Sequence, residues 1–348
     1  MSSLVFSNFH PAKITDKSIN QVLLDLIEQS SKIIIASGYI SNDAMVEIHR
    51  IAEDDIDRIQ ELSIFIGMHY IEGFTKNQYY SCVKLNQLLL EKGIGAVYVS
   101  PTMNFHGKIY SFVSNKGEHT GLIGSANLSS FIKNIERTYE TMFLAENDEI
   151  AKDIYDKNSK LFEELGIRID EAKTLGEDDF IQSRLDLSNL DGVAKIDELE
   201  ILKLLEQQSE YTFKIEIKPE ERSHLNPFFG KGRKNKRGFF VPRPWYEAEI
   251  IVPKSTTSLE GYPLKGEAFN VVTPDGWSFE CVTQGTNSKN LRSTGSLSIL
   301  GKWLKGHLEL KGCLQTGEKV TKEVFDDYGT NHLILRSTDQ PGLWIMEF

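Results

Sequence analysis

The chain has 348 residues and a hydrophobic fraction of 40%, which is enough for two ordinary domains with packed cores. Its formal net charge of −11 excludes a uniformly basic surface, so any nucleic-acid binding must depend on local clusters of positive charge. Three scattered cysteines exclude a disulfide framework, and no histidine spacing is that of a metal site. With no signal peptide or membrane span expected, the protein is predicted to be soluble and cytoplasmic, without a membrane partner.

Helical and strand-like patterns alternate through residues 1–170. Helices are predicted at 20–30, 43–54, 77–92 and 148–165. Strands are predicted at 32–40, 62–68, 96–100, 108–113, 121–124 and 141–145. This alternation is typical of an α/β layered domain.

The pattern changes after an acidic, weakly periodic stretch at 171–197, which is predicted to be a linker. From 198 to 348, short apolar runs are separated by Gly, Pro, Asn and Asp, and a helix or turn is expected at 297–304. Strands are predicted at 211–217, 246–252, 268–272, 277–282, 307–310 and 333–336. The second domain is therefore predicted to be mainly β, as a compact barrel or sandwich.

The sharpest local motif is NFHGKIY at 104–110. His106 and Lys108 are two residues apart on a strand-like run, so their side chains are expected on the same face. These residue types suit attack on a phosphodiester, with His106 as nucleophile or acid and Lys108 as a positive charge for the phosphoryl oxygens. Ser125 and Asn127, in GLIGSANLS, can donate hydrogen bonds to the same oxygens. Glu140, before the next apolar strand, can hold the imidazole in one tautomer.

Each of these features alone has an ordinary explanation. A single His-x-Lys occurs by chance in many proteins, and Ser125 and Asn127 alone are typical turn residues. The ordered set indicates a site, because His-x-Lys, Gly-Ser-x-Asn and a Glu before a strand follow one another at short intervals. Glu136 is an alternative to Glu140, since the spacing does not separate the two.

His-x-Lys followed by Gly-Ser-x-Asn resembles the signature of the phospholipase D superfamily, and this resemblance covers the first half of the chain. It implies a mixed sheet flanked by helices, in which one histidine attacks phosphorus, a second protonates the leaving group and no metal is used. Members with the full signature have an Asp shortly after the Lys, where this chain has Val113. The branch of restriction nucleases that this chain also resembles, as described below, lacks that Asp as well. Because the chain holds one His-x-Lys motif, the mechanism implies a homodimer with a composite active site.

A first acid-free, basic run spans residues 222–245. In a chain of net charge −11 this is a local reversal of charge, and it suits phosphates and base edges. The residues predicted to bind DNA here are Arg222, Lys231, Arg233, Lys234, Asn235, Lys236, Arg237, Arg243 and Trp245.

A second acid-free run spans residues 282–308. Arg and Lys suit guanine, and Asn and Gln suit adenine. The residues predicted to bind DNA here are Gln284, Asn287, Lys289, Asn290, Arg292 and Ser293, with Lys302 and Lys305 further along. A single basic cluster would indicate only a solvated loop, whereas two such runs in one β-rich domain favour double-stranded DNA as a partner.

The two runs resemble the N-arm and C-arm of B3-like DNA-binding domains, which are pseudobarrels. A phospholipase D-like nuclease followed by a B3-like domain resembles the R subunits of NgoAVII/CglI-type restriction endonucleases, which are related to BfiI. This resemblance implies a short, GC-rich, asymmetric target, cleavage at a distance from it, and a helicase-like ATPase partner subunit. The chain has no nucleotide-hydrolysing motif, so we expect no cofactor in this chain, and ATP and Mg only through that partner.

Two alternatives come from other functional classes. A lipid-acting phospholipase D-type phosphodiesterase would have two His-x-Lys motifs or a membrane-binding face, and neither is visible in the sequence. A non-catalytic DNA-binding regulator would not need the full set of His106, Lys108, Asn127 and Glu140. The predicted function is therefore restriction, by metal-independent hydrolysis of double-stranded DNA at positions set by a sequence-specific domain.

Overall fold

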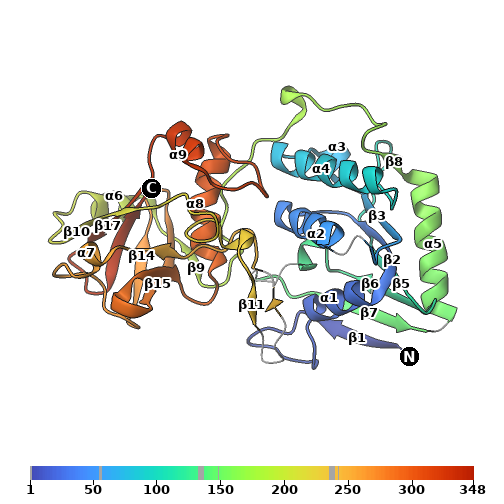
Figure 1. Ribbon diagram of the computed structural model, residues 1–348, viewed down its shortest axis with the longest axis horizontal. Helices are drawn as coiled ribbons and strands as arrows, with labels where there is room; N and C mark the ends of the chain where they lie inside the picture. The colour runs from blue at the N-terminus through green and yellow to red at the C-terminus, as the bar shows by residue number, and fades with distance from the viewer. Residues whose placement is uncertain (1, 55–56, 132–136, 148, 235–239, 242) are drawn as a thin grey trace. The chain divides into compact units, whose positions relative to one another are not determined.

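The computed structural model describes residues 2–54, 57–131, 137–147, 149–234, 240–241 and 243–348 (Figure 1). The chain forms two compact units, one of Met1–Asn134 with Thr138–Ser183 and the other of Ile135–Arg137 with Arg184–Phe348. The stretch expected as a linker, 171–197, is divided between these units. The chain therefore enters the second unit briefly at Arg137, returns to the first, and leaves it again after Ser183.

The first unit contains an eight-stranded mixed sheet in the order β1-β7-β6-β5-β2-β3-β4-β8. The strands are β1 Ser2–Phe6, β2 Ser30–Ser37, β3 Glu61–Ile66, β4 Val97–Val99, β5 Lys108–Ser114, β6 His119–Gly124, β7 Thr141–Glu146 and β8 Ile167–Arg168. Strands β2, β3 and β4 are parallel, whereas β5, β6, β7 and β1 continue the sheet in antiparallel pairs. The predicted α/β layering is confirmed.

Helices cover both faces of this sheet (Figure 1). They are α1 Ile19–Gln29, α2 Asn42–Asp54, α3 His69–Glu72, α4 Lys76–Lys92 and α5 Glu149–Leu165, with the 3₁₀ turns η1 Leu128–Phe131 and η2 Glu177–Asp179. Ile33 and Ile35 of β2 pack in the core that contains α1, α2 and α4. Ile34 and Ala36 face the other way, in the cluster that contains Phe162 of α5. This alternation explains why β2 reads as a continuous apolar run rather than as an alternating one.

The second unit is mainly β. Its curled sheet runs β10-β17-β18-β14-β15-β16-β13, with β9 also paired to β15 and a separate β11–β12 hairpin. The strands are β9 Val193–Lys195, β10 Thr212–Glu216, β11 Arg233–Lys234, β12 Phe240–Val241, β13 Ile250–Ile251, β14 Ala268–Val272, β15 Trp277–Gln284, β16 Asn290–Ser293, β17 His332–Ser337 and β18 Leu343–Glu347. The helices are α6 Glu198–Leu205, α7 Lys254–Thr257, α8 Ser298–Leu310 and α9 Lys322–Tyr328, with 3₁₀ turns η3 Pro227–Phe229 and η4 Thr286–Ser288.

Two strand predictions in this unit are wrong. The stretch 307–310 forms the last turn of α8, because Leu300, Trp303, Leu304 and Leu308 make one buried helical stripe. Glycine at 301 lets this helix pack tightly, since a Cβ there would lie 1.6 Å from the carbonyl oxygen of Tyr246. The stretch 246–252 contains only the two-residue β13.

Arg137 is held to the second unit by two hydrogen bonds. Its backbone N–H donates to the Asn189 carbonyl at 2.7 Å, and its guanidinium donates to the Val193 carbonyl at 2.5 Å. Val193 lies in β9, which pairs with β15. No helix in the described part of the chain is both long and apolar enough to cross a bilayer.

Candidate functional site

The predicted catalytic residues meet at one end of the first unit's sheet. Because β5 is antiparallel to both β2 and β6, its first residues lie beside the last residues of those strands. Lys108 therefore pairs with Ser37, at the end of β2. Gly124, at the end of β6, pairs with Met142 near the beginning of β7. Three motifs separated in sequence are thus brought to the same edge.

His106 and Lys108 are in direct contact. The Lys108 ammonium lies 3.3 Å from each ring nitrogen of His106 and donates to the His106 carbonyl at 2.6 Å. Lys108 is 6% exposed, whereas His106 is exposed. Burial lowers the pKa of Lys108, and the negative charge of Glu140 acts in the opposite direction. A partly desolvated cation therefore lies under an imidazole that is open to an incoming phosphate.

Asn127 is oriented by the end of β2. Its side-chain Oδ1 accepts hydrogen bonds from the Tyr39 backbone N–H at 3.2 Å and the Ser37 hydroxyl at 3.5 Å. Ser37 is fully buried, and its hydroxyl also donates to the Tyr39 carbonyl and accepts from the Leu128 N–H. Since the oxygen of the Asn127 amide is taken and its Nδ2 has no partner among the described residues, that nitrogen is available to donate to a phosphate oxygen.

Ser125 and Glu140 border the same edge but differ from expectation in detail. The Ser125 hydroxyl accepts from the Thr141 N–H at 3.0 Å and lies 3.3 Å from the Thr141 carbonyl, so it also ties β6 to β7. Glu140 exchanges two hydrogen bonds with Ser7 through its backbone, while the charge of its carboxylate partly opposes the lowering of the Lys108 pKa by burial. No hydrogen bond joins Glu140 to His106 among the described residues, so an imidazole-orienting role for Glu140 stays a prediction. Glu136 lies outside the described residues.

Backbone contacts hold the residues around His106. Gly38 N–H donates to the Gly107 carbonyl, and Phe105 N–H donates to the Gly67 carbonyl, both at 3.0 Å. A Cβ on Gly67 would lie 2.0 Å from the Phe105 carbonyl oxygen, so only glycine permits this approach. Glycines after β2 and β3 therefore fix the backbone on both sides of His106.

Tyr39 is a neighbour of the site that the motif did not reveal. The edge of its ring meets the His106 ring, with a centroid distance of 5.5 Å, and also meets His69 at 5.3 Å. Its hydroxyl donates to Glu72 at 2.7 Å. The sequence signal is SGY directly after a buried strand, which is the position where α/β proteins often place functional residues.

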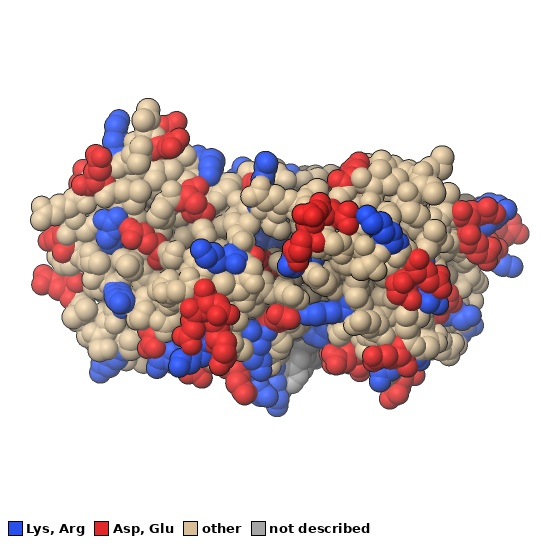
Figure 2. Space-filling view, turned by 90° about the horizontal axis from the view of Figure 1, so that it is seen from above, with Lys and Arg blue, Asp and Glu red and all other residues tan. Residues whose placement is uncertain are grey.

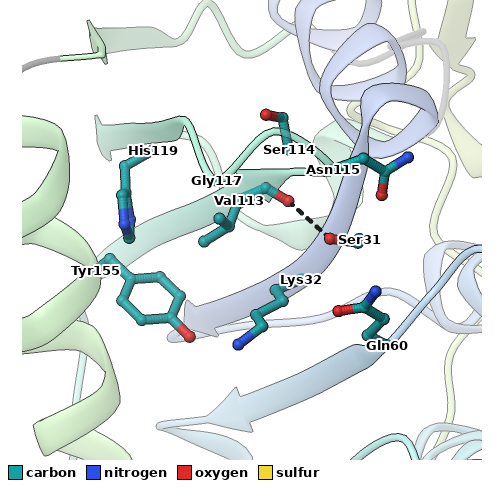
Figure 3. Close-up of a pocket in the computed structure, with 9 residues that line it drawn as sticks. All are labelled: Ser31, Lys32, Gln60, Val113, Ser114, Asn115, Gly117, His119 and Tyr155. Carbon is teal, nitrogen blue, oxygen red and sulfur yellow. Dashed lines mark hydrogen bonds between the residues drawn. The ribbon is translucent and has the colours of Figure 1, made fainter.

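A cavity of about 310 Å³ lies at the opposite end of this sheet (Figure 3). Its lining includes Lys32 at the beginning of β2, Val113 and Ser114 at the end of β5, and His119 at the beginning of β6. Figure 3 shows the ends of Lys32 and His119 directed toward Tyr155, whose ring lies 5.1 Å from that of His119. No residue of the predicted catalytic set lines this cavity, so the open edge around His106 is a separate site.

The first predicted DNA-binding run is partly described. Arg222, Lys231, Arg233 and Lys234 are exposed, and the last two form β11. Arg243 is half-buried. Asn235, Lys236 and Arg237 were also predicted to bind DNA, and these three lie outside the described residues. The described cations of this run thus surround the base of a short hairpin.

The second predicted run surrounds the turn between β15 and β16. Asn287 and Lys289 are exposed, whereas Gln284, Asn290 and Arg292 are half-buried. Asn287 has a φ of 57°, a left-handed conformation that asparagine tolerates better than most residues. The structure therefore presents a polar turn flanked by partly enclosed amide and guanidinium groups.

Three residues of these runs are buried, which corrects the expectation that their side chains are available to DNA. Trp245 is 1% exposed and its indole N–H donates to the Glu318 carbonyl, so it packs in the core rather than facing DNA. Ser293 is 2% exposed, and its hydroxyl donates to the Ser296 carbonyl. Lys305 is fully buried, with its ammonium 4.2 Å from the centre of a Trp245 ring.

Two acidic residues between the runs were missed. Glu247 and Glu249 follow the first basic run directly, and each is ion-paired with predicted DNA-binding arginines. Figure 2 shows acidic and basic side chains interspersed over the face in view. Among the described residues, no three His, Cys, Asp or Glu side chains gather in a way that could hold a metal ion.

Two family models match the chain. Residues 17–171 match the N-terminal PLD domain of the NgoFVII restriction endonuclease, and residues 203–339 match the NgoFVII C-terminal B3-like DNA-binding domain. No curated protein matches. Similar solved structures include Nuc, a phospholipase D family member from Salmonella typhimurium, at 14% identity and a TM-score of 0.30, covering 48% of this chain and 97% of that one.

Another is the phosphatidylserine synthase of Haemophilus influenzae Rd KW20, at 13% identity and a TM-score of 0.35, covering 51% of this chain and 42% of that one. The two family matches correspond to the two structural units, and together they cover most of the chain. The first unit is the phospholipase D-like domain, a mixed sheet between helices, and the second is the B3-like pseudobarrel. The chain belongs to the NgoFVII family of restriction endonucleases, with a phospholipase D-like nuclease domain followed by a B3-like DNA-binding domain.

Proposed function

We propose that this chain is an endodeoxyribonuclease that hydrolyses phosphodiesters of double-stranded DNA through a phosphohistidine intermediate. The contact between the exposed His106 ring and the buried Lys108 ammonium supports this proposal most directly. The amide nitrogen of Asn127 lies at the same edge and suits a phosphate oxygen. The site thus combines a nucleophile with two donors for developing negative charge.

The proposed reaction has two steps. A ring nitrogen of His106 forms a bond with phosphorus while the bond from phosphorus to the leaving sugar oxygen breaks, and a second histidine gives that oxygen its proton. Water then attacks phosphorus, its proton passes to the second histidine, and His106 is released. Lys108 and Asn127 hold the non-bridging oxygens throughout. Imidazoles and water account for every proton and electron pair, so these steps use no metal ion.

The second histidine must come from another chain, because the sequence holds one His-x-Lys motif. We place it as His106 of the partner subunit in a twofold homodimer, which would bring two identical residues to one phosphorus. The B3-like domain would direct this dimer to a specific sequence in the cytoplasm. By resemblance to its relatives, a helicase-like ATPase partner would supply the requirement for ATP and Mg.

A cleavage assay with the full-length chain tests the nuclease proposal. Plasmid DNA is incubated with the chain alone, and with the products of the neighbouring genes plus ATP, and the DNA ends are mapped. His106→Ala should abolish cleavage and leave DNA binding intact, whereas the control His119→Ala at the other end of the sheet should still cleave. Loss of both cleavage and DNA binding in His106→Ala would contradict the division of labour between the two domains.

Trapping the intermediate tests the chemistry. End-labelled DNA should leave label on the denatured wild-type chain in a linkage that acid releases and alkali spares, as expected for a phosphorus–nitrogen bond. The His106→Ala chain should carry no label. Cleavage without any labelled intermediate in rapid-quench samples would exclude this mechanism. In a separate assay, hydrolysis of phosphatidylcholine by the chain would favour a lipid substrate instead of DNA.

A further inference from the structure

One carboxylate, that of Glu247, joins two arginines at the base of the β11–β12 hairpin. The Glu247 carboxylate accepts from the Arg233 guanidinium at 3.0 Å and from Arg243 at 2.8 and 3.2 Å. Arg233 pairs with Val241 in the hairpin, and Arg243 follows two residues later. Since the Glu247 side chain is only 8% exposed, its position is set by the core, and it fixes the two arginines that flank the hairpin.

Glu249 extends this network to the second basic run. Its carboxylate lies 4.0 Å from Arg243 and 3.4 Å from Arg292, and it accepts from the Asn290 amide at 3.3 Å. Arg233, Glu247, Arg243, Glu249 and Arg292 therefore form a row of alternating charge. Glu249 is the member of this row that contacts both runs.

Strand register explains the position of Glu249. Ile250 pairs with Leu291 in antiparallel β13 and β16, so the residue before Ile250 lies opposite Arg292. On the other side, the Glu249 N–H donates to the His224 carbonyl at 3.0 Å, near the beginning of the first run. The backbone of Glu249 thus lies between the two runs, and its side chain is 18% exposed.

These contacts restrict the directions in which the arginine side chains can donate hydrogen bonds. A planar guanidinium held by a carboxylate has a fixed direction for its remaining N–H groups, whereas a free one samples many phosphate contacts. Among the three paired arginines, Arg243 and Arg292 have side chains only 16% and 30% exposed, so few of their N–H groups face solvent. The paired carboxylate also cancels much of the charge that would attract any DNA sequence equally.

We propose that Glu249 is a positioning residue for DNA sequence selectivity, because it holds Arg292 in line with the Glu247-bound Arg243, in one arrangement that a target sequence fits and other sequences do not. This inference rests on the proposed DNA-reading function of the domain. Asn290 belongs to the same support, since its Nδ2 is bonded to Glu249 and its Oδ1 is buried without a partner among the described residues.

Glu249→Gln removes the negative charge and keeps the size of the side chain. Arg292 would then turn toward phosphates, which are present in every sequence, whereas Arg243 keeps its hydrogen bonds to Glu247. We expect affinity for unrelated DNA to rise and the preference for the target to fall by about tenfold. The dependence of log K on log salt concentration should become steeper by about one, because at least one freed arginine adds a phosphate contact.

The experiment uses the full-length chain and DNA duplexes selected by the wild type from a random pool. Affinities for a selected duplex and its shuffled version are measured at several salt concentrations by fluorescence anisotropy. Glu267→Gln is the matched control, because Glu267 is exposed and the same charge is lost. Glu249→Asp, which keeps the charge, should retain more of the preference than Glu249→Gln. Thermal unfolding establishes that each variant is folded.

The outcomes separate the inference from the function on which it rests. A Glu249→Gln chain that keeps the wild-type preference, or that loses affinity for both duplexes equally, overturns the positioning role. A loss of preference in Glu267→Gln of the same size would do so as well. If the wild type selects no sequence at all, the proposed DNA-reading function fails, and the inference fails with it.

Discussion

The ammonium of Lys108 lies 3.3 Å from both ring nitrogens of His106, although Lys108 itself is almost entirely buried. Lys108→Met should therefore keep the packing and remove the charge that, in the proposed mechanism, stabilises the phosphate oxygens. We expect cleavage to slow by about 10²–10³-fold, the usual cost of losing one group that stabilises transition-state charge. Single-turnover cleavage is the measurement, and Lys116→Met, an exposed lysine in the turn after β5, is the control.

The same lysine predicts an alkaline limit to activity. Burial lowers the pKa of Lys108, and the group carries its charge only below that pKa. The cleavage rate should therefore fall with rising pH before the ordinary lysine value of about 10.4 is reached. A rate that stays constant up to that pH would show that the charge on Lys108 is not required.

Gly67 permits the close approach of Phe105, the residue before His106. Gly67→Ala would place a methyl group 2.0 Å from the Phe105 carbonyl oxygen, so the backbone that holds His106 must move. We expect a large loss of cleavage rate together with a lower midpoint of thermal unfolding. Gly176→Ala should change neither, because its Cβ would meet nothing closer than 3.9 Å and its φ of −97° suits alanine.

Tyr39 is expected to act through its ring rather than its hydroxyl. The ring contacts His106, whereas the hydroxyl is bonded to Glu72. Tyr39→Phe should cleave DNA at nearly the wild-type rate, and Tyr39→Ala should be slower by about tenfold, because His106 loses the ring that restricts its orientation. Equal rates for the two variants would argue against this restriction.

Lys305 predicts a pH dependence of stability. Burial lowers its pKa to about 7, against about 10.4 in the unfolded chain. Between these values the unfolded state binds a proton that the folded state does not, so the contribution of Lys305 to the free energy of unfolding rises with pH. Lys305→Met should remove this slope, and urea titrations from pH 7 to 10 would measure it. The control Lys311→Met, at an exposed position, should keep the wild-type slope.

The proposed catalytic motif could be found in the sequence because its residues lie close together along the chain. Two residues that are two apart near the beginning of a strand have the same orientation, which predicted the pairing of His106 with Lys108. The support from Ser37, Tyr39 and Gly67 was not readable. It depends on β2 lying antiparallel beside β5 and on β3 lying parallel on the other side of β2, and such pairings join segments that are far apart along the chain.

For the predicted DNA-binding residues, the sequence did not show which side chains face solvent and which pack in the core. An aromatic residue in a basic run can face either DNA or the core, and for Trp245 only the fold showed that it is the core. Glu247 and Glu249 lie just past the acid-free run and therefore were not recognised. Their importance follows from the register of β13 with β16, which hydrophobic alternation does not specify for a two-residue strand.

The brief passage of the chain through the second unit at Arg137 determines how the protein can be divided. A shortened protein that begins at Arg184 would leave the carbonyls of Asn189 and Val193 without the donors that Arg137 supplies. One that ends at Ser183 would carry Arg137 without its partners. Neither half can therefore be separated at a single boundary without losing these contacts. Exchanging the second domain between relatives requires exchanging two separate segments of the gene.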